Sequence, residues 1–361
     1  MRIGILTYHD ANNFGCAAQC FGLQEAVKEL FPEAEVEIIN YGRGKGPRIV
    51  PAGSEDEPPF VRARVFERFR RNYMNIPGET VYDPDKLDPI PYDVCIVGSD
   101  QVWNDKLVRG QERAYFLTFA GNDTRKISYA ASVGGTADDE ERVGWLLEWL
   151  PKMDAISIRE ESSFLRLKQK TNLPMTVCVD PSLLHDRSFW ESYEKKPERL
   201  GDEKYVFMYA LGYGWCREYE RRAAQMAADI AETYGLKVIH YYFGQLREWF
   251  PEDSKDCYCE GPQEILWLFH HAEYVVCCSF HGTAFSLIYE KPFYTFFVPD
   301  NGNRMKDLVT SLGIEERYIE DSLPKEEWDW EIPWDKVNAA LQKKRDESLD
   351  YLRREIGAAN E

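Results

Sequence analysis

The sequence lacks any long apolar segment. No uninterrupted apolar stretch approaches the roughly 18 to 20 residues that a helix needs to cross a bilayer. The first residues, MRIGILTYHD, contain neither the basic region nor the long apolar region of a secretory signal peptide. We therefore expect a cytoplasmic protein.

Positive charge is also scarce. The 361 residues include 44 basic and 62 acidic residues, which gives a formal net charge of −18. Such a chain repels DNA, RNA and anionic lipid unless its basic residues are concentrated in one place, so we expect no nucleic-acid partner. The segment VRARVFERFRRNY at residues 61–73 is basic and has helical spacing. It could make peripheral contact with a membrane or a lipid pyrophosphate, although a solvated helix with salt bridges is the favoured interpretation.

Paired cysteine motifs are missing as well. The nine cysteines are odd in number and scattered, and several stand in apolar runs, which indicates buried, reduced thiols. Cys257 and Cys259 stand near His270 and His271, which could suggest zinc, but a second Cys-x-x-Cys pair is absent. The apolar neighbours of the two histidines favour simple helix packing. We predict no metal site.

Nucleotide-binding loops are absent too. The first loop, NNFG, lacks both the G-x-G-x-x-G pattern and the lysine of a P-loop. These absences argue against a dinucleotide-dependent dehydrogenase and against an NTPase, and we predict no cofactor.

What the sequence does contain is an alternation of short β-rich runs and helical patterns, which is typical of parallel sheets covered by helices. Its length exceeds the usual size of a single hydrophobic core, and the charged segment EKKPERLGDEK interrupts the pattern at residues 194–204. We predict an α/β protein with two Rossmann-like domains, 1–200 and 201–333, whose parallel sheets face a central cleft. A helix in 334–361 could pack back across the hinge.

Ligands of open parallel sheets collect where strands end and helices begin. Polar, glycine-rich junctions of this kind are HDANNFG, GSDQVWN, SVGG, REES, DPS and SFHGT. In SFHGT, the residues before His281 alternate like a strand, and those after Gly282 have helical spacing. A histidine at a helix N-terminus can bind a phosphate or carboxylate and act as an acid. Packing or capping is the alternative interpretation, and we favour the functional one.

Two other junctions carry candidate residues. Arg159 ends the strand-like run DAISI and could bind an anion with two hydrogen bonds, or else form an ion pair with Glu160 or Glu161. The spacing alone does not decide between these. In GSDQVWN, Asp100 could face a sugar, whereas packing is the favoured interpretation of Trp103.

In order and combination, six segments of the chain resemble the polysaccharide pyruvyl transferase family. They are GILTYHDANNFGCAAQCFGLQEAV, VGSDQVWN, KISYAASVGG, ISIREESS, VDPSLL and VVCCSFHGTAFSLIYEKPF. The resemblance covers most of the chain. The first segment departs from the family's pattern at Ala18, where leucine is common.

The resemblance implies a GT-B-like fold and transfer of a pyruvyl group from phosphoenolpyruvate to two hydroxyls of one sugar, which gives a cyclic ketal and phosphate. The acceptor would be a bacterial-type surface glycan or its precursor, such as a polyprenyl-pyrophosphate-linked oligosaccharide at the inner face of the membrane. His281 matches the family's essential histidine, and Arg159 matches the arginine that holds the donor.

This chemistry agrees with the residues. The methylene carbon of phosphoenolpyruvate must be protonated, and its phosphate and carboxylate must be bound, so the site needs an acid and cationic or N–H donors. We assign His281 to protonation or phosphate binding and Arg159 to the carboxylate or phosphate. Further donor contacts are expected from Ser279, Gly282, Thr283 and Ser132. Candidates for acceptor binding or for the base are Asp100, Gln101, His9 and Asn13.

Two other functions compete with this one. A glycosyltransferase of the same architecture would use a nucleotide-sugar donor and bind a nucleoside diphosphate in the C-terminal domain. A non-catalytic glycan-binding protein would keep only the scaffold. The acceptor sugar, the ketal linkage and the oligomeric state are not encoded in any motif that the sequence displays.

Overall fold

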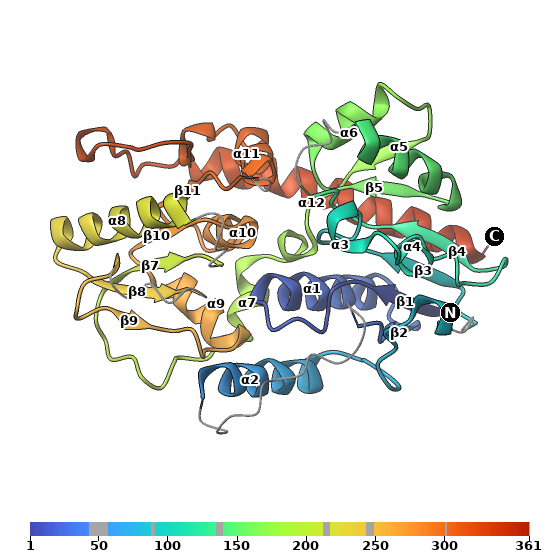
Figure 1. The fold of residues 1–361 in the computed structure, drawn as a ribbon, viewed down its shortest axis with the longest axis horizontal. Helices are drawn as coiled ribbons and strands as arrows, with labels where there is room; N and C mark the ends of the chain where they lie inside the picture. The colour runs from blue at the N-terminus through green and yellow to red at the C-terminus, as the bar shows by residue number, and fades with distance from the viewer. Residues whose placement is uncertain are drawn as a thin grey trace. The chain divides into compact units, whose positions relative to one another are not determined.

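The computed structural model describes residues 1–42, 57–87, 91–134, 140–211, 217–242, 249–299 and 302–360. The chain divides into two compact units (Figure 1). Unit 1 comprises Met1–Gly53, Phe66–His185 and Gln342–Glu361, and unit 2 comprises Ser54–Val65 and Asp186–Leu341. The domain limits suggested by the sequence, at residues 200 and 333, stay predictions.

Unit 1 is built around parallel strands. Four of them form a sheet in the order β2-β1-β3-β4, with β1 at Arg2–Leu6, β2 at Glu35–Ile38, β3 at Val94–Val97 and β4 at Arg125–Ser128. Two more, β5 (Ile156–Ile158) and β6 (Met175–Val177), pair with each other in parallel. Single bridges from Ala155 to Ile127 and from Ile158 to Ala131 place β5 beside β4.

Helices cover both faces of the unit 1 sheet. One face carries apolar residues of α1 (Phe14–Leu30) and of the second half of α12 (Trp334–Gly357), among them Leu23, Val27 and Leu352. Tyr351 on α12 also donates a hydrogen bond to the carbonyl of Ser128 at the end of β4, at 2.8 Å. The remaining helices of unit 1 are α3 (Asp105–Val108), α4 (Glu112–Tyr115), α5 (Glu140–Trp149) and α6 (Glu161–Lys168), while α2 (Pro58–Tyr73) has residues in both units.

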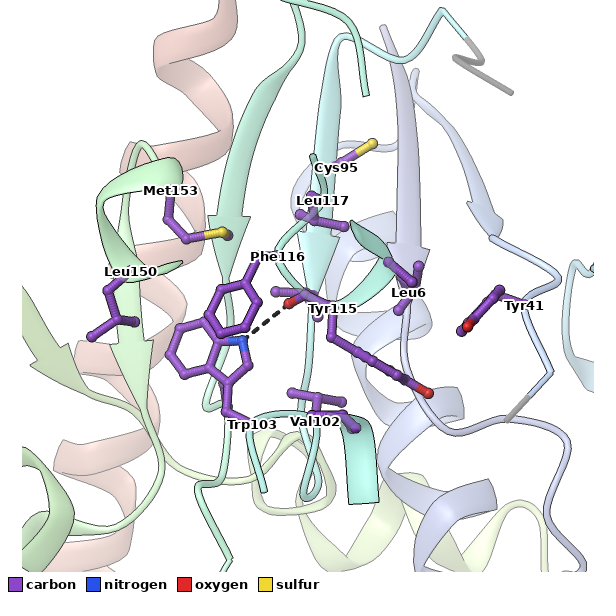
Figure 2. Packing of buried hydrophobic residues seen from close by; sticks show 14 of the residues in the cluster. Leu6, Tyr41, Cys95, Val102, Trp103, Tyr115, Phe116, Leu117, Leu150 and Met153 are labelled. Atoms are coloured by element: carbon purple, nitrogen blue, oxygen red, sulfur yellow. Dashed lines mark hydrogen bonds between the residues drawn. The ribbon is translucent and has the colours of Figure 1, made fainter. Parts of the chain in front are cut away.

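Trp103 belongs to the core on the other face. Its side chain is fully buried and stacks on Phe116, with ring centroids 5.4 Å apart. Figure 2 shows the indole nitrogen directed at the carbonyl of Tyr115, to which it donates a hydrogen bond of 3.0 Å. A buried indole with a satisfied N–H stabilises the fold. The preference for packing over sugar stacking at this tryptophan is therefore confirmed.

Unit 2 contains a six-stranded sheet in the order β12-β11-β10-β7-β8-β9, and its pairings are parallel. The strands are β7 (Tyr205–Tyr209), β8 (Lys237–Tyr241), β9 (Lys255–Asp256), β10 (Tyr274–Cys277), β11 (Phe293–Phe296) and β12 (Tyr318–Ile319). The helices are α7 (Arg187–Glu191), α8 (Arg217–Tyr234), α9 (Pro262–His271), α10 (Phe280–Ile288), α11 (Gly302–Ser311) and the first part of α12.

The α/β class predicted from the sequence is confirmed, and the strand-like and helical runs fall on the observed elements. One boundary differs. The helix expected from Gly282 begins at Phe280, because β10 ends at Cys277 and Ser279, in an extended conformation, is the N-cap residue. His281 consequently lies inside the first turn of α10.

Candidate functional site

The carboxyl ends of the unit 1 strands meet at a buried polar network centred on Asp180. This carboxylate is fully buried. One oxygen accepts hydrogen bonds from Arg159 Nη1 at 2.7 Å and from Ser99 Oγ at 3.2 Å. The other accepts from the backbone N–H and the hydroxyl of Ser182, at 3.0 and 2.8 Å. Each of these hydrogen bonds satisfies a buried polar group that would cost free energy if it had no partner. The network therefore fixes the strand ends relative to one another.

Arg159 follows β5 and lies between two carboxylates. Its Nη1 is 2.7 Å from Asp180 and its Nε is 3.1 Å from Glu160, and all three side chains are at most 2% exposed. Burial lowers the pKa of Arg159, but Glu160, Asp180 and Asp100 more than offset this effect and raise the pKa above its usual range. The guanidinium is therefore a permanent buried cation. The ion pair with Glu160 that the sequence allowed is present, and a second pair with Asp180 accompanies it.

Asp100 stands at the end of β3 in an unusual backbone conformation. Its φ is 64°, in the left-handed region that costs most residues free energy and that Asp tolerates better than most. The side chain is buried, accepts a hydrogen bond from the thiol of Cys16 at 3.3 Å and accepts the backbone N–H of Gln101 at 2.9 Å. Its carbonyl accepts the backbone N–H of Ser132 at 2.9 Å. Asp100 and Ser132, both predicted site residues, are thus neighbours in unit 1.

The other predicted residues of unit 1 already have local contacts. Gln101 accepts a side-chain hydrogen bond from Asn104 at 2.7 Å, and Ser132 accepts one from the backbone N–H of Gly134 at 3.1 Å. Asn13 is the N-cap residue of α1, and its side chain accepts the backbone N–H of Cys16 at 3.2 Å. Such a bond satisfies one of the unpaired donors of a helix start.

His9 is almost completely buried. Its Nδ1 is 3.3 Å from the carbonyl of Thr7, and its Nε2 is 3.1 Å from Asn40 Oδ1. Burial lowers the pKa of His9, although Asp10, Asn40 and the Thr7 carbonyl oppose the shift. Both ring nitrogens therefore face protein oxygens, so a role for His9 as a base would require one of these contacts to open.

Several residues of this network carry no prediction of their own, among them Gln19, Thr7 and Asp180. Gln19 is fully buried on α1, donates to the hydroxyl of Thr7 at 2.9 Å and accepts the backbone N–H of Ser99 at 3.1 Å. Asp180 directly follows the strand-like run TVCV, in the same kind of junction as the predicted residues. The signal for Gln19 is a polar residue within an otherwise apolar helix face. The signal for Asp180 is an aspartate at a strand end.

In unit 2, His281 occupies the second position of α10. Its side chain is buried, and its ring packs edge-on against Phe280 with centroids 5.3 Å apart. The N-cap residue Ser279 is also buried but makes no side-chain capping bond. Since the backbone N–H groups of a first helical turn have no partner within the helix, His281 and Ser279 stand where an anion is favoured.

Thr283 and Gly282 hold this turn against the sheet. The Thr283 hydroxyl lies 3.1 Å from the carbonyl of Ser279 and 2.9 Å from the hydroxyl of Thr295, and Thr283 is fully buried. A Cβ at Gly282 would lie 2.7 Å from Cys277 Cβ and 3.0 Å from the ring of Tyr209. Only glycine lets the helix approach the strands this closely.

The predicted residues therefore form two groups. Asp100, Gln101, Ser132 and Arg159 lie at the strand ends of unit 1, and Ser279, Gly282, Thr283 and His281 lie on one turn in unit 2. His9 and Asn13 belong to unit 1, on the loop before α1. Their roles toward substrates stay predictions.

The histidine pair of α9 meets a residue that the sequence did not connect with it. Within the described part of the chain, a group that could hold a metal ion combines His270 and His271 with Glu194, and their ligand atoms lie within 4.8 Å of one another. Cys257 and Cys259 are not in this group.

The basic helix α2 uses part of its charge within the protein. In unit 2, the Arg62 guanidinium lies between the rings of Tyr241 and Tyr258, at 4.8 and 4.9 Å from their centroids, and donates to the Tyr258 carbonyl. In unit 1, Arg71 pairs with Glu67 at 2.9 Å. Among the described residues, no helix is long and apolar enough to cross a membrane.

Comparison with known proteins gives one family and one fold. The family model described as polysaccharide pyruvyl transferase matches residues 13–301. No curated protein matches the chain.

Solved structures resemble the whole chain at low identity. A candidate UDP-N-acetylglucosamine 2-epimerase from Listeria monocytogenes superposes with a TM-score of 0.59 at 10% identity, over 98% of this chain and 90% of the other. Medicago truncatula UGT71G1, complexed with UDP-glucose, gives 0.52 at 10% identity, over 100% and 98%. The S. aureus MnaA–UDP structure gives 0.52 at 10% identity, over 98% and 90%. The fold is therefore that of GT-B-type glycosyltransferases and epimerases, as predicted.

Proposed function

The chain belongs to the polysaccharide pyruvyl transferase family, and we propose that it transfers a pyruvyl group from phosphoenolpyruvate to two hydroxyls of one sugar. The observation that carries this proposal is the family match over residues 13–301, which includes both Arg159 and His281. The products are a cyclic pyruvate ketal and phosphate. The acceptor is a sugar of a bacterial-type surface glycan or of its lipid-linked precursor, modified in the cytoplasm or at the inner face of the membrane.

The reaction balances without a redox partner. A proton adds to the methylene carbon of phosphoenolpyruvate, which turns it into a methyl group and makes the adjacent carbon electrophilic. One sugar hydroxyl adds to that carbon and a second displaces the phosphate. The two hydroxyls release two protons, of which one replaces the proton given to the methylene and the other leaves with the phosphate. The protein must therefore supply an acid, a base and binding groups for two anions.

His281 is the proposed acid or phosphate ligand. Its place in the first turn of α10 puts the imidazole beside backbone N–H groups that favour an anion. A phosphate at this turn would stabilise the protonated imidazole, and a protonated imidazole could then give its proton to the methylene carbon. Ser279 is proposed to donate to the same phosphate. Gly282 and Thr283 contribute by holding the turn in place.

Arg159 is the proposed ligand for the donor's carboxylate or phosphate. Its buried guanidinium is a fixed cation at the strand ends of unit 1, and a planar guanidinium matches the geometry of carboxylate and phosphate groups. Asp100 is the proposed base for the acceptor hydroxyl, with His9 as the weaker candidate. Gln101, Asn13 and Ser132 are proposed to contact the substrates.

The decisive experiment supplies phosphoenolpyruvate with a panel of soluble and lipid-linked glycans carrying galactose, mannose or glucose. Phosphate release and the mass of an added pyruvyl ketal are measured together. We expect both with at least one acceptor, and neither without phosphoenolpyruvate. Absence of both across the panel would count against the proposal.

Variants then test the residues. We expect His281→Gln to abolish ketal formation and Arg159→Lys to raise the KM for phosphoenolpyruvate. The matched control is Ser286→Ala on the same helix, because this change removes only a hydroxyl that donates to the Gly282 carbonyl at 2.8 Å. Full activity of both site variants, with an unchanged fold, would refute the assignment and favour a glycan-binding protein.

A glycosyltransferase using a nucleotide-sugar donor is the competing function, since the fold is shared with such enzymes. It predicts tight binding of a nucleoside diphosphate. Calorimetric titration with UDP, ADP and GDP therefore discriminates between the two: we expect no binding of any of them and binding of phosphoenolpyruvate.

A further inference from the structure

Unit 2 contains a second cluster of polar side chains, separate in sequence from the α10 turn. It joins the last turn of α9, which carries His270 and His271, to Glu194, which follows α7 in the chain. His270 Nδ1 lies 3.0 Å from Glu194, and His271 Nδ1 lies 4.0 Å from it. The two elements are brought together only by folding, because 76 positions separate Glu194 from His270.

The largely buried Glu194 carboxylate is the centre of this cluster. His270 Nδ1 lies 3.0 Å from each of its two oxygens. The hydroxyl of Tyr289 interacts with the same carboxylate. A carboxylate that two imidazoles approach is placed to share an ion with them.

The histidine rings are already held in fixed orientations. The ring of His270 stacks on that of Tyr289, with centroids 5.0 Å apart and planes 7° apart. The ring of His271 stacks on that of Trp267, with centroids 4.1 Å apart. Rings that are fixed before binding lose little conformational freedom when they coordinate an ion.

We propose that Glu194, His270 and His271 bind a Zn²⁺ ion. Two imidazole nitrogens and a carboxylate oxygen are a ligand set that zinc favours, and water would complete a tetrahedral site. With bonds of about 2.0–2.2 Å to a tetrahedral ion, neighbouring ligand atoms lie about 3.3–3.5 Å apart. The observed distances of 3.0 and 4.0 Å bracket this value. The site departs from the cysteine and histidine set that the sequence suggested, because its third ligand is Glu194.

The surroundings supply the second layer of contacts. His270 Nε2 lies 3.4 Å from Glu191, so once Nδ1 binds the ion, the remaining N–H can donate to a carboxylate, as is usual for metal-bound histidine. Arg187 now donates to the same nitrogen at 2.7 Å, and it pairs with Glu191 at 2.6 Å. Binding therefore requires Arg187 to turn away from His270 and keep its bond to Glu191. It also requires His271 Nδ1 to give up its contact with the Trp267 carbonyl, which now lies 3.0 Å away.

Access also suits a cation. The His271 side chain is 42% exposed, which leaves the cluster open to solvent on that side, whereas Glu194 is 9% exposed.

The ion would stabilise the support of α10. Trp190 of α7 and Phe269 of α9 both pack against Phe285 of α10, with ring centroids 5.1 and 5.9 Å apart. A link between Glu194 and the end of α9 fastens these two elements to each other. The site is structural, and it does not depend on the proposed reaction.

Calorimetric titration of the chelator-treated protein with ZnCl₂ tests the site. We expect one ion per chain, a rise in Tm on binding, and a visible absorption band of tetrahedral Co²⁺ when CoCl₂ replaces zinc. His271→Ala, at a position whose side chain is 42% exposed, should abolish stoichiometric binding. Glu191→Gln should weaken binding by about 10- to 100-fold through the outer contact.

Cys259→Ser is the matched control, because it removes the ligand that the sequence alone suggested. We expect it to leave zinc binding unchanged. Absence of stoichiometric binding in the unmodified protein would overturn the proposal and show an ordinary ion-pair network. Zinc binding that persists in His271→Ala, or that is lost in Cys259→Ser, would also overturn the proposal. These readouts do not involve phosphoenolpyruvate, so their failure is distinct from failure of the proposed function.

Discussion

Replacement of Asp180 by asparagine tests whether the buried network of unit 1 depends on charge. The asparagine side chain has the same shape but one acceptor fewer. If its amide NH₂ faces Arg159, it opposes a guanidinium N–H, and if it faces Ser182, it opposes a backbone N–H. In either orientation a buried donor loses its acceptor at a position that is fully buried.

The magnitude follows from the pair that is broken. Removing one partner of a buried ion pair costs about 3–5 kcal/mol, and one hydrogen bond to a charged group contributes about 1.5–3 kcal/mol. Arg159 keeps its bond to Glu160 at 3.1 Å in this variant, so the loss of stability should lie nearer to the second, smaller value. We expect a loss of about 2–3 kcal/mol, which for a unit of this size lowers Tm by about 4–12 °C.

Thermal unfolding followed by calorimetry at neutral pH measures this change. Ser182→Ala is the control, because it keeps the pair between Asp180 and Arg159 and should cost at most about 1 kcal/mol. Arg159→Met should also destabilise the protein, since it leaves Glu160 and Asp180 buried without their cation. The double variant Asp180→Asn with Arg159→Met should then lose clearly less than the sum of the single losses. Additive losses within about 0.5 kcal/mol, or a Tm shift below about 1 °C for Asp180→Asn, would refute the reasoning.

Three further predictions concern stability. Gly282→Ala should destabilise unit 2 by about 1–3 kcal/mol in thermal unfolding, because its Cβ would lie 2.7 Å from a strand side chain. Gly144→Ala is the control, because the space around Gly144 is open, and it should be neutral or stabilising. Asn13→Ala should lower the free energy of unfolding by about 1 kcal/mol, because it removes the side chain that caps α1. Asn13→Asp should keep this cap. Equal denaturation midpoints for the two variants would contradict the prediction. Burial lowers the pKa of both His9 and His185, so the unfolded chain binds more protons below its histidine pKa of about 6.5. The free energy of unfolding should therefore fall as pH is lowered from about 7.5 through about 6. A denaturation series across this range checks it, and His9→Gln with His185→Gln should flatten the slope.

Local patterns predict the elements well because side-chain periodicity and strand-to-helix junctions are properties of neighbouring residues. The run before His281 reads as a strand and the run after it as a helix, and both are present. That helix begins two residues before the start that its pattern indicates, because a strand-like residue such as Phe280 is also compatible with a first helical turn when Ser279 is the N-cap residue.

The candidate site was predictable in part for the same reason. Asp100, Ser132 and Arg159 stand at successive strand ends, and parallel strands bring such ends to one edge of a sheet. Gln19 was harder to find, because its role arises from a bond to Ser99, 80 positions away. Nothing in the local sequence of α1 shows that partner.

By itself, the sequence determined the α/β class, the alternation of strands and helices, the packing of Trp103 and the family resemblance, since each depends on residues close together in the chain. The tertiary structure alone decided which groups share a buried environment. It paired Arg159 with Asp180 as well as Glu160, and it brought Glu194 to the histidine pair of α9. The physical reason is that hydrogen bonds and ion pairs act over a few ångströms in space, and distance along the chain does not encode them.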